Sequence, residues 1–302
     1  MAKIAVELER ALARRREGGT PAQTTPRVIA RGDGWSVADV VCTCGPWDRP
    51  YEERHSHDTI AIVSAGSFEY RSPAGRGLMT AGSLLLGNDG HGFECAHRHG
   101  EGDRCVSFWY APGYFERLAA DAGARGIDRR FKVPALPALR ELSPFVAQAG
   151  LGMRRATEVP WEEFAVALAG RVVRLASRLP AHGTGLPLNA AASVTRAVRM
   201  IDCHPDGALT LGRLAREAGL SPYHFLRTFK SLIGITPHQY VLRARLREAA
   251  RRLATDASKV LDVALDCGFG DVSNFNRAFR TEFGASPLAF RRALRPADFP
   301  LA

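Results

Sequence analysis

Histidines in the first third of the 302-residue chain have the spacing of metal ligands. His55 and His57 are two residues apart, so on a strand both side chains would point to the same side. Together with His91 they form a candidate three-histidine site, in which Cys95 could replace one ligand. Imidazole ligands suit zinc, iron or nickel. A transition metal is therefore a candidate cofactor of this part of the chain.

A second, sulfur-rich set of side chains lies in the same part. It consists of Cys42, Cys44, Cys95 and Cys105 together with His97 and His99. The Cys-x-Cys and Cys-x-His-x-His spacings are typical of a soft-metal site or of a thiol redox switch. The alternative is that these residues only line a sheet and that the thiols stay reduced. Cys203 and Cys267 fall within helical apolar patterns and are expected to be buried.

These side chains fall in a region of short apolar runs broken by glycines and turn residues. Turns recur about every ten residues between 28 and 110, which is typical of an antiparallel barrel or sandwich. From Pro112 the apolar period changes to three or four, and residues 113–123, 138–150 and 160–179 are predicted to be helices. Residues 179–191 hold two glycines and two prolines without periodicity, and we predict a linker there.

The last third of the chain contains an internal repeat, in which residues 211–240 align with residues 261–290. The matching pairs are Ala215 and Ala264, Gly219 and Gly268, Phe225 and Phe275, Arg227 and Arg277, Phe229 and Phe279, Lys230 and Arg280, Gly234 and Gly284, and Pro237 and Pro287. Chance agreement at so many positions is improbable, so the sequence predicts a duplicated module.

Each copy specifies two short helices joined by a glycine turn. The glycine can adopt the positive φ of a tight turn, and Ser221 or Asp271 can cap the helix that follows. Phenylalanines four residues apart then face the core, which leaves the opposite face polar and basic. This is the helix-turn-helix arrangement, whose second helix can enter a major groove. A pair of helical hairpins without a nucleic-acid role is the competing interpretation.

The distribution of charge favours the DNA-binding interpretation. The chain has a formal net charge of +10 and a pI of about 9.8. Residues 189–302 hold 17 basic and 10 acidic residues, whereas residues 1–188 hold 24 and 21. Most of the excess therefore lies in the third of the chain that carries the repeat, as expected for a protein whose partner is a polyanion.

Residues 192–295 resemble the DNA-binding domain of the AraC/XylS transcription regulators. The motifs that carry this resemblance are Val263-Ala264, Cys267-Gly268-Phe269, the run from Ser273 to Arg280, Phe283-Gly284 and the run from Ser286 to Arg291. The resemblance implies helix-turn-helix units at about 211–232 and about 260–283, joined by a long helix over 237–254. Val272 stands where many relatives carry a polar residue, which argues against hydrogen-bond readout from that position.

The same resemblance implies a sensor in the first half of the chain. This sensor would be a cupin-like β-barrel (28–111), preceded by an N-terminal segment (1–27) and followed by a helical segment for dimerisation or coupling (112–178). Metal-binding cupins carry a glutamate shortly after the paired histidines. Ala61 and Ile62 occupy that place here, so the usual four-ligand set is incomplete.

DNA contacts are expected on the face of each second helix that lies opposite the phenylalanines. Arginine can bind guanine O6 and N7 in a bidentate manner and asparagine can do the same with adenine, whereas Lys230 and Arg280 are expected to anchor phosphates. The full set of expected contacts is Tyr223, Leu226, Arg227, Lys230, Ser273, Asn274, Asn276, Arg277 and Arg280.

The sequence thus predicts an α+β chain, with a cupin-like antiparallel barrel and flanking helices ahead of an all-α double helix-turn-helix domain. We expect a sequence-specific transcriptional regulator of the AraC type that is not an enzyme. Its expected partners are double-stranded DNA, RNA polymerase, a small-molecule or metal effector and a second copy of the chain. The alternatives are a metal-dependent cupin enzyme fused to a basic helical domain and a DNA-repair methyl acceptor with a reactive cysteine.

The sequence also carries expectations about location. Its start lacks the apolar segment of a secretory signal, and no stretch approaches the ~18 apolar residues of a membrane span. We therefore expect no membrane association, a cytoplasmic location and reduced thiols.

Overall fold

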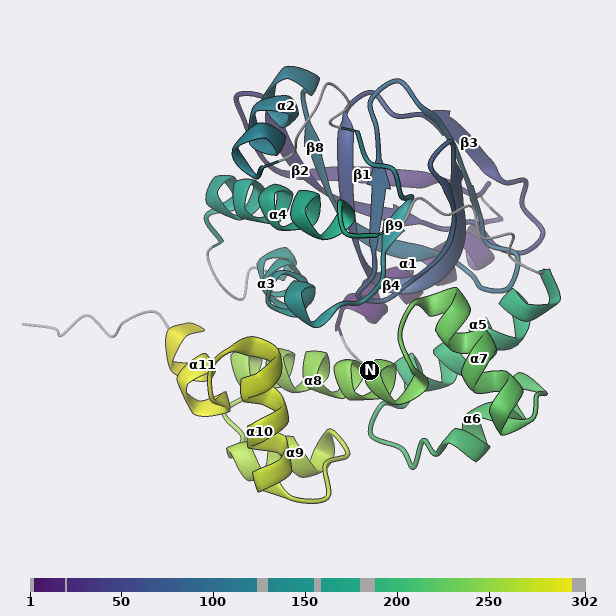
Figure 1. Cartoon of the computed structure of the whole chain (residues 1–302). Coiled ribbons are helices and arrows are strands. Elements are labelled where there is room, and N and C mark those ends of the chain that lie inside the picture. The colour runs from purple at the N-terminus through teal and green to yellow at the C-terminus, as the bar shows by residue number, and fades with distance from the viewer. Residues whose placement is uncertain (1–2, 20, 124–129, 155–158, 180–187, 295–302) are drawn as a thin grey trace, which may run out of the picture.

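The computed structural model describes residues 3–19, 21–123, 130–154, 159–179 and 188–294. A β-sheet region is followed along the chain by a helical region (Figure 1), which confirms the predicted fold class. Ahead of the sheet lies helix α1 (Lys3–Gly18), for which the sequence analysis made no prediction. This helix packs against strands β2, β4 and β8.

Nine strands form the sheet region, and all of the pairings between them in the described residues are antiparallel. They are β1 (Thr24–Gly32), β2 (Trp35–Cys42), β3 (Tyr51–Arg54), β4 (Asp58–Ser72), β5 (Gly75–Thr80), β6 (Leu84–Gly87), β7 (Gly92–Ala96), β8 (Asp103–Tyr110) and β9 (Ala135–Leu136). The main path of hydrogen-bonded neighbours runs β1-β2-β8-β4-β6-β9. Its end strands β1 and β9 do not pair with each other in the described part of the chain, so a closed barrel stays a prediction.

Strand β4 links two parts of the sheet. Its first half pairs with β6 and β8, and its second half pairs with β5 and β7. The change of direction coincides with a β-bulge between Val63 and Ala65 and with Gly66, whose φ is +80°. A side chain at Gly66 would also collide with the backbone, because its Cβ would lie 2.2 Å from the carbonyl oxygen of Gly102. Only glycine fits this corner.

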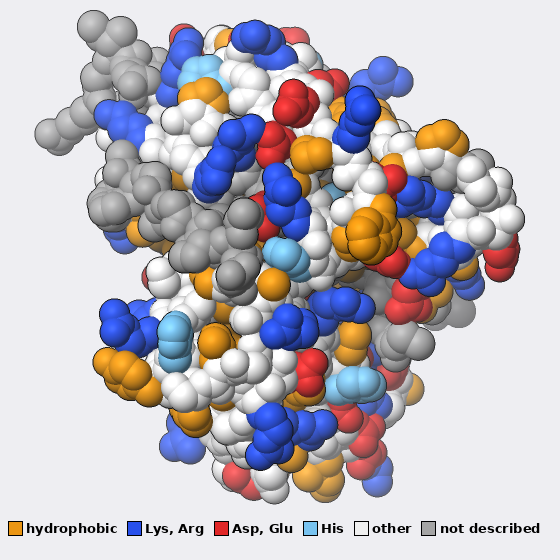
Figure 2. All heavy atoms as spheres, turned by 90° about the vertical axis from the view of Figure 1, so that its right-hand side faces the viewer, with side chains coloured by type: hydrophobic (Ala, Val, Ile, Leu, Met, Phe, Trp, Pro, Cys, Tyr) orange, Lys and Arg blue, Asp and Glu red, His pale blue; other side chains and the backbone are white. Residues whose placement is uncertain are grey.

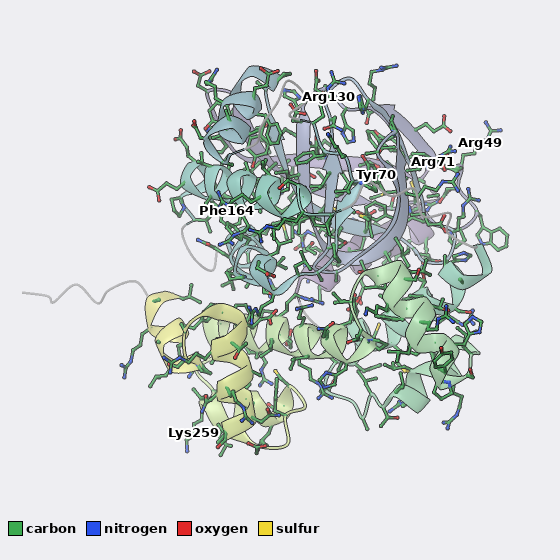
Figure 3. All side chains as sticks on the ribbon, viewed as in Figure 1. Arg49, Tyr70, Arg71, Arg130, Phe164 and Lys259 are labelled. Carbon is green, nitrogen blue, oxygen red and sulfur yellow. The ribbon has the colours of Figure 1, made fainter. Side chains whose placement is uncertain are left out.

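Three helices cover one face of the sheet, namely α2 (Pro112–Asp121), α3 (Ser143–Met153) and α4 (Trp161–Ala176). Side chains of β4 alternate as a strand requires. Ile60 and Ile62 pack in the core beneath these helices, whereas Ala61 and Val63 belong to a second core on the other face. Phe164 of α4 stacks on a phenylalanine of β8 with ring centroids 5.3 Å apart (Figure 3).

The helix predicted over 138–150 begins later than expected. Residues 135–136 pair with β6 as β9, and a 3₁₀ turn (Arg140–Leu142) precedes the first residue of α3. The start of the predicted helix thus forms the tighter 3₁₀ turn, and α3 runs from Ser143 to Met153. The predicted helices 113–123 and 160–179 correspond to α2 and α4, both of which end two to three residues earlier.

Seven helices make up the described helical region. They are α5 (Leu188–Cys203), α6 (Leu211–Ala218), α7 (Pro222–Ile233), α8 (Pro237–Thr255), α9 (Val260–Asp266), α10 (Val272–Phe283) and α11 (Pro287–Leu294). Helix α5 starts inside the predicted linker 179–191, of which residues 180–187 lie outside the described residues. No described helix is long and apolar enough to cross a membrane.

Helix α8 is shared by two separate cores. Its first half packs with α5, α6 and α7, and its second half packs with α9 and α10. The sheet region rests along α8 and its neighbours (Figure 1). Leu78 of β5 and Ala138 are buried in the core that contains α7, and Ser143 of α3 hydrogen-bonds Glu282 of α10. The sheet region thus contacts both helix-turn-helix units, at α7 and at α10.

Candidate nucleic-acid interface

Local sequence determines the two helix-turn-helix units in the way the repeat predicts. Gly219 and Gly268 have φ values of +69° and +82°, which confirms the predicted turns. The Ser221 hydroxyl accepts a hydrogen bond from the amide of His224, and the Asp271 carboxylate accepts one of 2.7 Å from the amide of Asn274. Both predicted N-caps are therefore confirmed, and they fix where α7 and α10 begin.

Paired phenylalanines hold each second helix in its core. Phe225 and Phe229 of α7 are completely buried, as are Phe275 and Phe279 of α10. The opposite faces of α7 and α10 carry the side chains for which DNA contacts are predicted. All of these are exposed except Leu226, which is half-buried; the exposed ones are Tyr223, Arg227, Lys230, Ser273, Asn274, Asn276, Arg277 and Arg280. The exposed faces of α7 and α10 are thus oriented as DNA recognition requires, while the individual contacts with DNA stay predictions.

The basic side chains of α8 differ from those of α7 and α10 in having internal partners. Arg243 pairs with Glu282, Arg251 with Glu248, and Arg252 with Asp256 and Asp266. Arg245 donates to the carbonyl oxygens of Pro205 and Gly207 at 2.7 and 2.9 Å. In α8, the charges of Arg243, Arg251 and Arg252 are thus balanced by carboxylates, and the donors of Arg245 are used in hydrogen bonds to the backbone.

In contrast, the cations on the two exposed helix faces have no carboxylate within 4.0 Å among the described residues. These are Arg227, Lys230, Arg277 and Arg280. Arg227 lies over the ring of Tyr223, with its guanidinium carbon 5.8 Å from the ring centroid. Lys259, just ahead of α9, extends outward beside α9 and α10 (Figure 3). On the face drawn in Figure 2, Lys and Arg side chains are intermixed with acidic ones, so net charge alone does not mark the interface.

Helix α10 also borders a depression with a volume of about 900 Å³. Asn276, Arg277 and Arg280 line one side of it, and Val260, Val272 and Leu288 are among the apolar residues that line the rest. Val272 is half-buried there. Such a surface offers donors beside an apolar contact, which are the two features that base edges and a thymine methyl group require.

Comparison with known proteins assigns this interface to a family. A family model described as a helix-turn-helix domain matches residues 214–293. The probable transcription factor PqrA of Proteus vulgaris is 36% identical over 83 residues, which are 28% of this chain and 68% of PqrA. The chain belongs to the AraC/XylS family.

Other relatives of this AraC/XylS chain match over the same region. The probable transcriptional regulator LumQ of Photobacterium leiognathi is 39% identical over 95 residues, which are 32% of this chain but only 38% of LumQ. The solved DNA-binding domain of AdpA, a global transcriptional factor in complex with a target DNA, is 33% identical. It covers 36% of this chain and 98% of that domain, with a TM-score of 0.34. The relatives are named as transcriptional regulators, and the enzyme alternative is not supported.

In the sheet region of this AraC/XylS chain, the three predicted histidine ligands do not assemble. Residues 55–57 lie between β3 and β4 rather than on a strand, so the alternation that would align His55 with His57 does not apply. Nε2 of His55 is 2.9 Å from the hydroxyl of Tyr70, and Nε2 of His91 accepts from Arg130 at 2.9 Å. In the described ranges these histidines do not form a group with ligand atoms within 4.8 Å of one another.

His55 instead occupies a tight internal position. Its ring stacks on Phe93 with centroids 4.1 Å apart, and a Cβ on Gly87 would lie 2.3 Å from its Nε2. Tyr70, labelled inside the sheet region in Figure 3, donates its hydroxyl proton to the carbonyl oxygen of Leu86. The tyrosine oxygen is therefore left to accept from Nε2 of His55. Burial, reinforced by the nearby imidazole of His91, lowers the pKa of His55 to about 4.

The lowered pKa of His55 predicts that this residue destabilises the folded sheet region at low pH. As the pH falls below about 6.5, the unfolded chain binds a proton that the folded chain accepts only near pH 4. The contribution of His55 to the free energy of unfolding should therefore fall through this window, by on the order of 3 kcal/mol in total, and be absent above it. The raised pKa values of Asp58 and Asp202, both about 6, act in the opposite direction over part of the same window. Urea unfolding at several pH values measures this slope. His55→Phe should lose less stability between pH 6.5 and 4 than the wild type does, whereas replacement of the exposed His224 by Gln should leave the wild-type pH dependence unchanged. The same pH dependence in all three proteins would contradict the assignment.

The sulfur-rich set assembles in part. Cys42, Cys44 and His97 each place a potential ligand atom within 4.8 Å of the other two, and all three residues are buried. The Cys42 thiol donates to the sulfur of Cys44, which raises the pKa of Cys42 and lowers that of Cys44. Cys95, Cys105 and His99 are not part of this group.

Several residues that shape these sites were not singled out from the sequence. Asp103 binds His97, and Glu282 and Ser143 join α10 to α3. Isolated carboxylates and serines carry no local signal, and only the pairing of distant segments gives them a role. The expectation that Cys203 is buried is wrong, because Cys203 is at the exposed end of α5, whereas Cys267 is buried as predicted.

Proposed function

We propose that the chain is a sequence-specific DNA-binding transcriptional regulator that acts in the cytoplasm. In this proposal, α7 and α10 read two successive major-groove segments of one duplex, with α8 as the rigid spacer between them. Residues 28–111 act as the sensor of a small-molecule or metal effector. Residues 112–178 couple the sensor to the DNA-binding region or to a second copy of the chain, and RNA polymerase is the further partner.

One observation carries the DNA-binding part of the proposal. The arginines of α8 have internal partners, whereas the cations of α7 and α10 have no carboxylate within 4.0 Å in the described part of the chain. If the basic residues served only to keep the surface solvated, the arginines of α8 and the cations of α7 and α10 would not need to differ in this way. Cations held outward beside buried phenylalanines are what phosphate neutralisation and base readout both require.

The test uses the purified full chain with double-stranded DNA from the promoter near its own gene. Footprinting should detect protection of two neighbouring segments about one helical turn apart. Affinity should decrease linearly on a logarithmic scale as the salt concentration rises, because bound phosphates release counterions. Absence of binding to any double-stranded DNA at low ionic strength would contradict the proposal.

Replacement of Arg227 by alanine should weaken binding by ~1–3 kcal/mol and relax specificity at one base pair. The reason is that the exposed guanidinium is proposed to bind a guanine edge in a bidentate manner. Binding of the variant to a set of operators mutated at single positions measures both effects.

Lys230→Ala is the matched control on the same helix. As a proposed phosphate anchor, Lys230 should contribute about equally on every sequence, and its loss should reduce the salt dependence. If Arg227→Ala also weakened binding equally on all sequences, Arg227 would be a phosphate contact, and its proposed role as a base reader would be wrong.

A further inference from the structure

A buried group of two cysteines and one histidine joins two distant segments of the sheet region. Cys42 ends β2, Cys44 lies two residues beyond it, and His97 directly follows β7. Their exposed fractions are 6%, 8% and 4%. Each contributes a potential ligand atom, and these atoms lie within 4.8 Å of one another. Two sulfurs and one imidazole nitrogen are a donor set that favours a thiophilic cation.

The orientation of His97 is an independent observation at the same place. Its Nε2 lies 2.8 Å from the Oδ1 atom of Asp103, and both side chains are buried. A carboxylate accepts, so Nε2 carries the proton and Nδ1 has the free lone pair in the neutral ring. Nδ1 is buried and has no hydrogen-bond partner in the described chain. Buried ring nitrogens seldom lack a partner, and a metal ion is one way to provide it.

The carboxylate that orients His97 is itself fixed. The other oxygen of Asp103 accepts a hydrogen bond of 3.2 Å from the thiol of Cys105. Histidines that bind metals usually donate their second ring N–H to such a carboxylate, which sets the tautomer and the ring orientation. The hydrogen bonds from Cys105 to Asp103 and from His97 to Asp103 therefore form the kind of network that orients a metal-binding histidine.

We propose that Cys42, Cys44 and His97 bind one Zn²⁺ ion, with Asp103 as the positioning residue of His97. Two thiolates balance the charge of the ion, and three protein ligands leave the fourth tetrahedral position open. A water molecule or a donor group of an effector can occupy that position. As a metal site this proposal stands on its own, whereas as the sensing element of a regulator it rests on the proposed function.

Helix α1 covers the segment that carries Cys44. Arg15 donates to the carbonyl oxygen of Thr43 and pairs with Asp48 at 2.7 Å. Leu8 is buried against Gly102, which lies between His97 and Asp103 in the chain. A bound ion would thus tie together the two segments on which α1 rests. It should stabilise the folded sheet region, because it binds a site that the unfolded chain does not preform.

The experiment measures zinc binding by the full chain, separately from DNA binding. Metal-stripped protein is titrated with Zn²⁺ against a chromophoric chelator, and Co²⁺ replaces zinc for spectroscopy. We expect one tightly bound ion per chain, a thiolate-to-cobalt charge-transfer band and a rise in the melting temperature with zinc. Absence of stoichiometric zinc binding would overturn the proposal.

Variants assign the ligands. The double substitution Cys42→Ser and Cys44→Ser should abolish tight binding and the charge-transfer band, and Asp103→Asn should keep the stoichiometry but weaken affinity 10–100-fold. Cys203→Ser, at the exposed cysteine, is the matched control and should bind like the wild type. A folded double variant with unchanged affinity would overturn the proposal, as would loss of zinc only when His55, His57 and His91 are replaced.

Two further measurements keep the result interpretable. If the double variant does not fold, alkylation of the wild-type chain with and without zinc, followed by mass spectrometry, takes its place. Zinc should protect Cys42 and Cys44 but not Cys203, and equal alkylation with and without zinc would overturn the proposal. DNA binding of the zinc-loaded chain is recorded in parallel, so a protein that binds zinc but no DNA would contradict the proposed function and not this site.

Discussion

Phe229→Ala is expected to lower the free energy of unfolding of the first helix-turn-helix unit by about 3–5 kcal/mol. The Phe229 ring is completely buried and packs edge-on against Phe225 and Tyr240, with centroids 5.4 and 5.8 Å apart. Alanine would leave a cavity that α6 and α8 cannot both move to fill. Chemical denaturation, together with footprinting of the operator, measures the loss. We expect protection to disappear first over the segment that α7 reads.

The internal repeat supplies the matched control, Phe279→Ala. Phe279 is equally buried but belongs to the other core, where it packs against Phe275, Phe283 and Phe290. A similar loss of stability is expected, with footprint protection lost over the other segment. If each variant lost protection of both DNA segments equally, the two helix-turn-helix units would not be packed independently on α8.

The two phenylalanines also differ in what else they support. The core around Phe229 includes the buried Leu78 and Ala138 of the sheet region. Among the described residues, the core around Phe279 has only the partly buried Ala147 of α3 packed against it from there. Phe229→Ala should therefore loosen the contact between α7 and β5 as well. Hydrogen exchange in β5 is expected to increase in this variant and not in Phe279→Ala.

The helix-turn-helix units could be predicted from sequence because their determinants are local. The turn glycines, the caps at Ser221 and Asp271, and phenylalanines four residues apart all act within a dozen residues. The fold of the C-terminal third was therefore predictable almost element by element. Its surface was less so, because the arginines of α8 find partners on other helices, such as Glu282, that only tertiary packing brings near.

For the sheet region, the fold class could be predicted from the sequence, but the grouping of Cys42, Cys44 and His97 could not. Alternation on β4 is readable, yet the pairing that brings Cys42 and Cys44 to His97 depends on the ends of β2 and β7, which are far apart in the chain. The three-histidine prediction assumed that His55 and His57 lie on a strand. The chain bends between β3 and β4 at that place, so the two-residue spacing has no fixed geometric meaning there.

Glu282→Ala is expected to have an effect as large as that of Phe229→Ala, by a different mechanism. The Glu282 carboxylate is buried, accepts from the hydroxyl of Ser143 on α3 and pairs with Arg243 of α8, whose Nε lies 3.1 Å away. Removing the carboxylate would leave the largely buried guanidinium of Arg243 without its opposing charge. Breaking a buried ion pair from one side costs about 3–5 kcal/mol.

Ser143→Ala separates the two contributions of Glu282. It removes the hydrogen bond between α3 and α10, together with the long 3.5 Å contact of the same hydroxyl with the carbonyl oxygen of Leu139, and keeps the pair with Arg243. A smaller loss of about 1.5–3 kcal/mol is therefore expected. Hydrogen exchange should increase at the contact between α3 and α10 in both variants, but within α8 and α10 only in Glu282→Ala. Equal destabilisation by the two substitutions would mean that the ion pair contributes nothing.

The position of Glu282 on α10 decides what this contact does for DNA binding. It is five residues beyond Arg277, which places the two side chains about 140° apart around the helix. Docking on α3 therefore fixes the orientation of α10 without covering its predicted DNA face. If this orientation is the one that fits two successive grooves, Ser143→Ala should weaken binding to the full operator while leaving binding to the α7 half-site unchanged. Tighter binding by Ser143→Ala would instead mean that the docked arrangement restrains α10 from DNA, and a competition assay with full and half operators distinguishes the two outcomes.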